Sequence, residues 1–207
     1  DGNLGSFLQQ GGNNDVLSGS SISTSTWYFI AATVDSSTHK LYVNGSQQGS
    51  SAHGLDTTAI GTEQIVIGER VGAIGGGNAG DVKVFNPRIY NRALSESEIQ
   101  TLYNEQVISG AEQSFPQVSP IARYKLDGDA TDSASDNDGT NNGVSFVDDA
   151  LYGQAGKLES NNNDYIDLSG EFDIRSFDAF SVGGWVRNED ISRSSVIFSA
   201  DENSSTS

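Results

Sequence analysis

Cysteine is absent from the 207 residues, so disulfides and thiolate metal sites are excluded. No stretch reaches the roughly 18 apolar residues of a membrane span, and we expect no membrane insertion. Lysine and arginine number 11 against 28 acidic residues, which gives a net charge of −17. Phosphate binding needs clustered basic side chains, so nucleic acid is excluded as a partner. An anionic membrane surface is disfavoured for the same reason.

Turn-forming residues are abundant instead. The apolar fraction is 35%, below the average for globular domains, and Gly, Ser, Asn and Asp fill the difference. This composition predicts many short strands joined by turns, and therefore a sandwich. The candidate strands lie at about 4–10, 26–34, 39–44, 64–68, 80–90, 121–127, 143–147, 156–159, 164–168, 179–187 and 195–200.

The segment "STWYFIAATVDSSTHKLYVNG", residues 25–45, predicts a hairpin. Its first strand places Trp27 and Phe29 on one face and Ile30 on the other. Its second strand places Leu41 on one face and Tyr42 on the other. Asp-Ser-Ser-Thr and Asn-Gly bound the two runs, as hairpin turns require.

One helix is expected at residues 95–105, in "LSESEIQTLYNE". Ser95 is suited to the N-cap and Glu98 completes a capping box. Ile99, Leu102 and Tyr103 form an apolar stripe at helical spacing. Residues 106–120 contain two of the three prolines and no periodicity, which predicts a linker.

The segments "STWYFIAATVDSSTHKLYVNG", "RIYNRALSESEIQTLYNE", "ARYKLDGDATDSASDNDGTNNGVSF", "GKLESNNNDYIDLSG" and "FSVGGWVR" carry a resemblance to a known family. Together they resemble the laminin-G-like jelly rolls of the concanavalin-A-like superfamily. The resemblance implies an all-β antiparallel β-sandwich with one short helix at 95–105. The halves stand in permuted order: residues 1–105 resemble the C-terminal half, 106–120 form the linker, and 121–207 resemble the N-terminal half.

An acidic loop at residues 127–139, "DGDATDSASDNDG", is the candidate metal site. Crowded carboxylates are relieved by a hard cation bound through oxygen, and the resemblance implies calcium near this loop. The expected ligands are Asp127, Asp129, Asp132 and Asp138, to which Asp81 and Asn86 would add oxygens from across the sandwich. The alternative is a solvated acidic loop without an ion.

No catalytic residues are expected, and the chain is not expected to be an enzyme. Related glucanases need a second carboxylate two or three residues after the Asp of a Glu-x-Asp pair. In "EFDIRSF" Glu171 and Asp173 are present, but Arg175 and Ser176 stand where that carboxylate would be. His39 and His53 belong to no triad motif and are interpreted as surface residues.

The aromatic residues allow two interpretations. Trp27 and Trp185 lie in apolar strands, which favours core packing over a role as sugar platforms. The better candidates for exposed aromatics are Tyr28, Tyr42, Tyr152 and Tyr165.

The expected function is a non-catalytic structural or adhesive module of an extracellular or cell-surface repeat protein or filament, with sandwiches completed between consecutive copies. Pairing of the two halves within one chain is the alternative, and a length of 15 residues lets the linker reach roughly 50 Å. The expected partners are neighbouring copies, and glycans or cell-surface proteins. The alternative function is calcium-dependent, lectin-like glycan binding. The start at Asp1 without methionine suggests a processed or excised piece.

Overall fold

The computed structural model describes residues 3–10, 13–52, 64–68, 81–105, 119–159, 162, 164–168, 170–173, 176–190 and 198–201. The strands are β1 (Asn3–Gln10), β2 (Asn13–Ser21), β3 (Trp27–Val34), β4 (Thr38–Val43), β5 (Ser46–Ala52), β6 (Gln64–Ile67), β7 (Val82–Tyr90), β8 (Ala122–Arg123), β9 (Thr140–Asn142), β10 (Ser145–Asp149), β11 (Gly153–Leu158), β12 (Tyr165–Asp167), β13 (Phe180–Asn188) and β14 (Phe198–Asp201). The helix α1 spans Glu96–Asn104.

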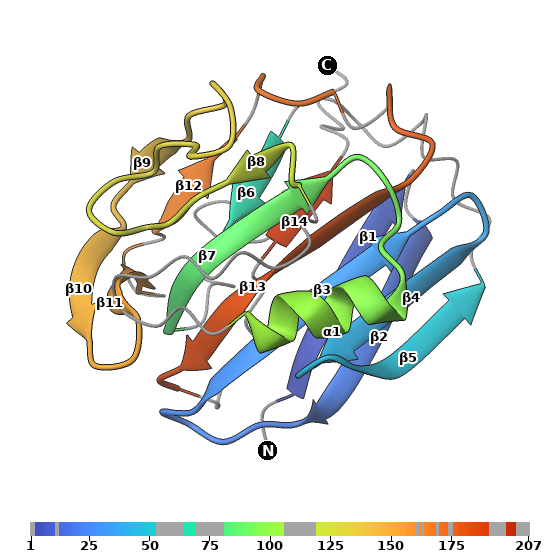
Figure 1. Cartoon of the computed structure of the whole chain (residues 1–207), viewed down its shortest axis with the longest axis horizontal. Helices are drawn as coiled ribbons and strands as arrows, with labels where there is room; N and C mark the ends of the chain where they lie inside the picture. Colours follow the sequence, from blue (N-terminus) through green and yellow to red (C-terminus); the bar gives the residue numbers. More distant parts are fainter. Residues whose placement is uncertain are drawn as a thin grey trace.

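The strands form an antiparallel sandwich, which confirms the predicted fold class (Figure 1). The large sheet has the order β10-β11-β7-β13-β3-β4-β5, with β8 paired to β7. The small sheet has the order β14-β6-β12-β9, and β1 and β2 form a separate hairpin. This hairpin packs against β14 on one side and against β4 and β5 on the other.

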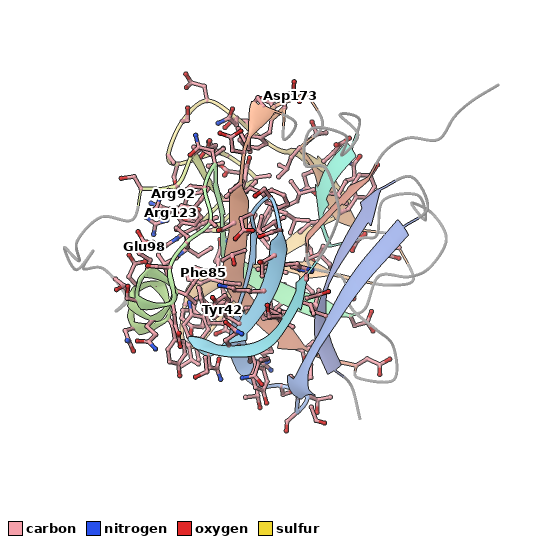
Figure 2. All side chains as sticks on the ribbon, turned by 90° about the vertical axis from the view of Figure 1, so that its right-hand side faces the viewer. Tyr42, Phe85, Arg92, Glu98, Arg123 and Asp173 are labelled. Carbon is pink, nitrogen blue, oxygen red and sulfur yellow. The ribbon has the colours of Figure 1, made fainter. Side chains whose placement is uncertain are left out.

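Two apolar layers cover the two faces of the large sheet. The inner layer, between the sheets, includes Ile30, Leu41, Val84, Ile166 and Val186. The outer layer includes Phe29, Ala31, Tyr42, Tyr90, Leu94, Ile99 and Leu102, because α1 lies across this face of β3, β4 and β7. In Figure 2 α1 stands on one side of the large sheet and the β1–β2 hairpin on the other. We call the helix side the outer face.

The predicted hairpin at residues 25–45 is confirmed. β3 and β4 pair in register, with Ile30 opposite Val43 and Ala32 opposite Leu41. The Asp35 carboxylate accepts hydrogen bonds from the Ser37 and Thr38 N–H groups at 2.9 and 2.8 Å and so shapes the turn. Strict alternation sends Ile30 to the inner layer and Phe29 to the outer one.

The predicted helix is also confirmed, with its capping box. Ser95 Oγ accepts from the Glu98 N–H, and the Glu98 carboxylate accepts from the Ser95 N–H at 2.8 Å. Ile99 and Leu102 are buried against the sheet, as their spacing predicts. At the other end, Glu105 forms an ion pair with the buried Arg88 of β7. The ion pair therefore attaches the C-terminal end of the helix to the sheet.

The two halves of the chain alternate within both sheets. In the large sheet β13 lies between β7 and β3, and β11 pairs with the other edge of β7. In the small sheet β6 lies between β14 and β12. The sandwich is thus completed within one chain, which is the alternative to the expected completion between copies. Completion within the chain is favoured over completion between chains because a short connection holds each half at high effective concentration near the other.

Several local expectations were wrong. β2, β5 and β9 were not predicted, since their Ser-, Gln- and Asn-rich sequences read as turns. The expected strand at 121–127 is reduced to β8, with a bridge from Tyr124 to Asp132. His39 is fully buried rather than at the surface, because it lies on the same face of β4 as Leu41. Residues 106–118 of the expected linker, and His53, lie outside the described residues.

Candidate ligand-binding surface on the outer face of the large sheet

Six aromatic rings contact one another on the outer face, beside α1. We call them the aromatic patch: Trp27, Phe29, Phe85, Tyr103, Tyr152 and Trp185. Tyr152 is the central ring. It stacks on Phe85, with ring centroids 4.7 Å apart, and meets Trp27 edge to face at 5.1 Å. Trp185 lies 5.4 Å from it.

Strand register explains why these residues meet. Trp185 of β13 is opposite Phe29 of β3 on one side and opposite Phe85 of β7 on the other. Trp27 lies on the same face as Phe29, two residues earlier. Figure 2 shows Phe85 on the same side of the sheet as Tyr42, the side that α1 occupies. The patch therefore overlaps the layer under the helix at Phe29 and Tyr103 and continues it beyond the helix.

The patch is exposed in part. Phe29 and Phe85 are buried, whereas Trp27, Tyr152 and Trp185 are only half-buried. Close beside it, Leu151 is 62% exposed at the β10–β11 turn. Contiguous apolar surface that is rimmed by polar groups is a feature of binding sites, so we treat this patch as a candidate binding site.

Asp149 organises one edge of the patch. Its side chain is 4% exposed, and its Oδ2 accepts from Trp27 Nε1 at 3.4 Å and from an Arg187 terminal nitrogen at 3.3 Å. Its Oδ1 accepts from the Leu151 N–H at 3.0 Å, which shapes the turn that carries Tyr152. One carboxylate thus positions an indole, a guanidinium and the turn of the central tyrosine.

Further ion pairs lie beside Asp149 along this edge of the aromatic patch. Glu189 lies 3.1 Å from Arg187 Nε and 3.8 Å from Lys83 Nζ. Burial, together with the Asp149 carboxylate, raises the pKa of Tyr152 to about 12. The phenol is therefore protonated at neutral pH and offers a hydrogen-bond donor. The surface combines apolar rings with carboxylate, guanidinium, ammonium and phenol groups, which suits a ligand that has both an apolar face and hydroxyls.

The interpretation of the aromatic residues is confirmed in part and corrected in part. Trp27 and Trp185, which were expected to pack in the core, are both partly buried on the outer face, and Trp185 packs against the outer layer. Tyr42 was interpreted as exposed, but it is buried beneath α1. Tyr152, and also Tyr28 and Tyr165, are half-buried.

The acidic loop is organised by its own hydrogen bonds. Asp132 is buried, and its Oδ1 accepts from the Arg123 and Ala134 N–H groups, both at 2.8 Å. Its Oδ2 accepts from the Asn137 side-chain amide at 3.0 Å. Asp138 accepts from the Asp132 N–H at 2.8 Å. These carboxylates close the loop on itself.

The candidate calcium ligands of this loop can be judged from their hydrogen-bond partners and their exposure. Asp127 and Asp129 are exposed, and Asp129 accepts from the Thr131 N–H at 3.0 Å. Asn86 is committed elsewhere, since its Oδ1 accepts from Arg123 Nε at 2.8 Å. Among the described residues, which include the whole loop, no three His, Cys, Asp or Glu side chains are grouped as metal ligands. The described geometry favours the self-bonded loop over a preformed ion site, and calcium binding stays a prediction.

Glu171 and Asp173 lie in a turn ahead of β13, where the Glu171 N–H donates to the Leu168 carbonyl. They are not on a strand, as the two carboxylates of the related glucanases are. Both side chains are exposed, and Figure 2 shows Asp173 well away from Phe85.

The sequence did not indicate Phe85, Tyr103, Asp149 and Arg187 as parts of the site. Strand alternation was the one available signal, because it puts Phe85 and Arg187 on the face that α1 shares. Asp149 is 122 positions from Trp27, and no local pattern connects the two residues.

The fold is an all-β antiparallel sandwich, and this surface is its candidate ligand-binding site. Residues 1–100 match the family model Laminin_G_3, described as the concanavalin A-like lectin/glucanases superfamily, so this part of the chain is similar to that superfamily. The resemblance found in the sequence is thereby confirmed, while the permuted order of the halves is not tested. No curated protein and no solved structure matches the chain.

Domains of this superfamily that are laminin-G-like are generally non-catalytic and typically extracellular, and the match fits a binding or adhesive module. Within the described ranges, no helix has the length and apolarity needed to cross a membrane.

Proposed function

We propose that the protein is a non-catalytic recognition module of an extracellular or cell-surface protein, and that it binds glycans through the aromatic patch. The observation that carries the proposal is the arrangement around Tyr152. A half-buried phenol and two half-buried indoles lie next to a hydrogen-bonding edge that Asp149 organises.

Pyranose rings with equatorial hydroxyls present flat C–H faces, and aromatic rings bind such faces. Tyr152 is supported from below by Phe85 and from the side by Trp27, so little conformational entropy is lost when a ligand binds. Sugar hydroxyls both donate and accept hydrogen bonds. Arg187 and Glu189, whose side chains are 25% and 28% exposed, offer both kinds of partner at the edge of the rings.

The negative charge of the chain favours neutral glycans over anionic ones as ligands. The net charge of −17 repels sulfated or uronate-rich chains at long range. The cations beside the patch are already paired with carboxylates, so they add little attraction for anions. Neutral oligosaccharides with equatorial hydroxyls, such as the β-linked glucans, are therefore the proposed ligand class. Attachment to such glycans on a surface would make the module adhesive.

The proposal is tested by titrating the protein with soluble hexasaccharides of β-1,4-linked and β-1,3-linked glucose and following tryptophan fluorescence. Trp27 and Trp185 are the only tryptophans, so the signal comes from the patch. We expect Tyr152→Ala to weaken binding about tenfold or more, as truncation of an aromatic anchor does. Tyr152→Phe, which keeps the ring, should retain most of the affinity.

The matched control is Tyr165→Ala, which removes a half-buried tyrosine from β12 of the small sheet. This variant should bind like the wild type. The same samples should release no reducing sugar, in keeping with a module that binds without hydrolysis. Binding that Tyr152→Ala leaves intact, or sugar release, would contradict the proposal.

A further inference from the structure

We infer that the strand slot between β3 and β7, which β13 of the same chain fills, also accepts β13 of a second copy, so that two chains exchange their second halves. Here the first half is residues 3–105 and the second half is residues 119–201. The inference concerns assembly and stands independently of glycan binding.

The first observation is that the inner layer between the two sheets needs residues of both halves. β13 pairs over most of its length with β3 on one edge and with β7 on the other. Val84 of the first half lies directly opposite Val186 of the second, and both are buried in the inner layer. A first half without β13 would have β3 and β7 separated by an empty strand position, with the inner layer open to water.

The second observation is steric matching between β13 and the slot. A Cβ at Gly183 would lie 3.1 Å from Ala31 Cβ of β3, and a Cβ at Gly184 would lie 3.0 Å from Pro87 Cα of β7. The β7 backbone bulges toward Gly184, where the register shifts and Asn86 has a φ of 56°. A strand with side chains at these two positions would not fit without displacing its neighbours.

The third observation is a buried polar match. Ser181 of β13 is fully buried, and its Oγ donates to the Arg92 carbonyl at 2.8 Å and accepts from the Leu94 N–H at 2.9 Å. These partners belong to the segment that leads into α1. An apolar residue at this position would leave a buried N–H and a buried carbonyl without their partner.

Steric and polar matching together identify the occupant. The slot requires two consecutive glycines and a serine at a fixed register, and β13 of this chain supplies them. A second copy carries the same β13, and the paired surface is identical whether or not the strands share a chain. The intrachain form is favoured at low protein concentration, because the connection sets a high effective concentration. Exchange is favoured when many chains fold together at high concentration.

The test uses two full-length variants that each damage one half. Val84→Asp places a charge in the first half, and Val186→Asp places one in the second, at positions that are 0% and 1% exposed. Each variant refolded alone should fail to recover native tryptophan fluorescence. When the two are refolded together, an exchanged pair contains one sandwich made of two undamaged halves. The mixture should then recover about half of the native signal, in a species of twice the chain mass.

The matched control mixes Val84→Asp with Ile89→Asp, a buried position that is also in the first half. No exchange between these chains yields an undamaged first half, so this mixture should stay unfolded. Wild-type protein refolded at high concentration provides an independent measurement and should contain a dimer that is absent at low concentration. A Val84→Asp and Val186→Asp mixture that behaves like its separate components, together with wild-type protein that stays monomeric throughout, would overturn the inference.

Discussion

Asp132→Ala is expected to destabilise the protein strongly, because one buried carboxylate holds the acidic loop together. It accepts from the Arg123 and Ala134 N–H groups at 2.8 Å, and from the Asn137 backbone and side-chain nitrogens at 3.3 and 3.0 Å. A hydrogen bond to a charged acceptor contributes roughly 1.5–3 kcal/mol when buried. Two of these bonds are short, and the exposed side of the loop lets water replace part of the rest. The expected loss is about 3–4 kcal/mol, a large fraction of a typical unfolding free energy.

The assay is urea denaturation at 25 °C, followed by tryptophan fluorescence and fitted to a two-state transition. Asp136→Ala is the control, since this aspartate lies in the same loop and is exposed. It should change the unfolding free energy by less than about 0.5 kcal/mol. Asp132→Asn should fall between the two, because the amide oxygen still accepts while its NH₂ group faces N–H donors. A loss below about 1 kcal/mol for Asp132→Ala would refute the reasoning.

The same denaturation curves test the calcium prediction. An ion that binds only the folded state raises the transition midpoint in proportion to the logarithm of its concentration. A midpoint that rises with calcium in the wild type, but not in Asp132→Ala, would support an ion at the loop. Equal midpoints in calcium and in chelator would contradict calcium binding, and the loop would then be stabilised by its hydrogen bonds alone.

Two further variants test the attachment of α1 and of β13. The Arg92 guanidinium and the Ser95 N–H and hydroxyl lower the pKa of Glu98 to about 2, below its ordinary value of 4.5. Since the folded pKa is the lower one, the stabilisation is complete above about pH 4.5 and is lost as the pH falls toward 2. Glu98→Gln should therefore cost about 1 kcal/mol at pH 7 and nearly nothing at pH 2, measured by urea denaturation at both values. Ser181→Ala should cost about 2 kcal/mol at all pH values, because it leaves the buried Leu94 N–H without an acceptor; an equal midpoint for wild type and variant would contradict this.

The parts of the fold that sequence could predict are those set by neighbouring residues. The β3–β4 hairpin follows from strict alternation between two turn sequences, and α1 follows from Ser95 and Glu98 at capping-box spacing. The polar strand β5 was not predicted, because it is set by pairing with another strand and not by its own sequence. Its Ser- and Gln-rich sequence has low strand propensity, and it is extended because β4 pairs with it.

The burial of a strand residue could be predicted only where it was known which elements pack on each face of the sheet. His39 shares a face with Leu41, so alternation alone places it inside, and its interpretation as a surface residue neglected that signal. Tyr42 is different. Its face becomes buried because α1, which begins 54 positions later at Glu96, packs over it. The alternation of residues along a strand can predict an exposed sheet face, and that face is nevertheless buried when an element distant in the sequence packs over it.

The aromatic patch depends on contacts between distant segments. Trp27, Tyr152 and Trp185 come from three separate strands and turns, and strand order brings them together. Sequence identified Tyr152 as a candidate exposed aromatic, but it did not predict that Phe85 lies beneath it or that Asp149 fixes its turn.

The most direct test of the proposed function is a titration followed by the two indole N–H signals in a nitrogen-15 NMR spectrum. The chain has two tryptophans, and both belong to the patch, so each signal reports on one side of Tyr152. Addition of a neutral β-glucan hexasaccharide should shift both signals in a saturable manner in the wild type, and Tyr152→Ala should need about tenfold or more ligand for the same shifts. Saturable binding that moves neither indole signal, or no binding to any neutral hexasaccharide, would contradict recognition through the aromatic patch.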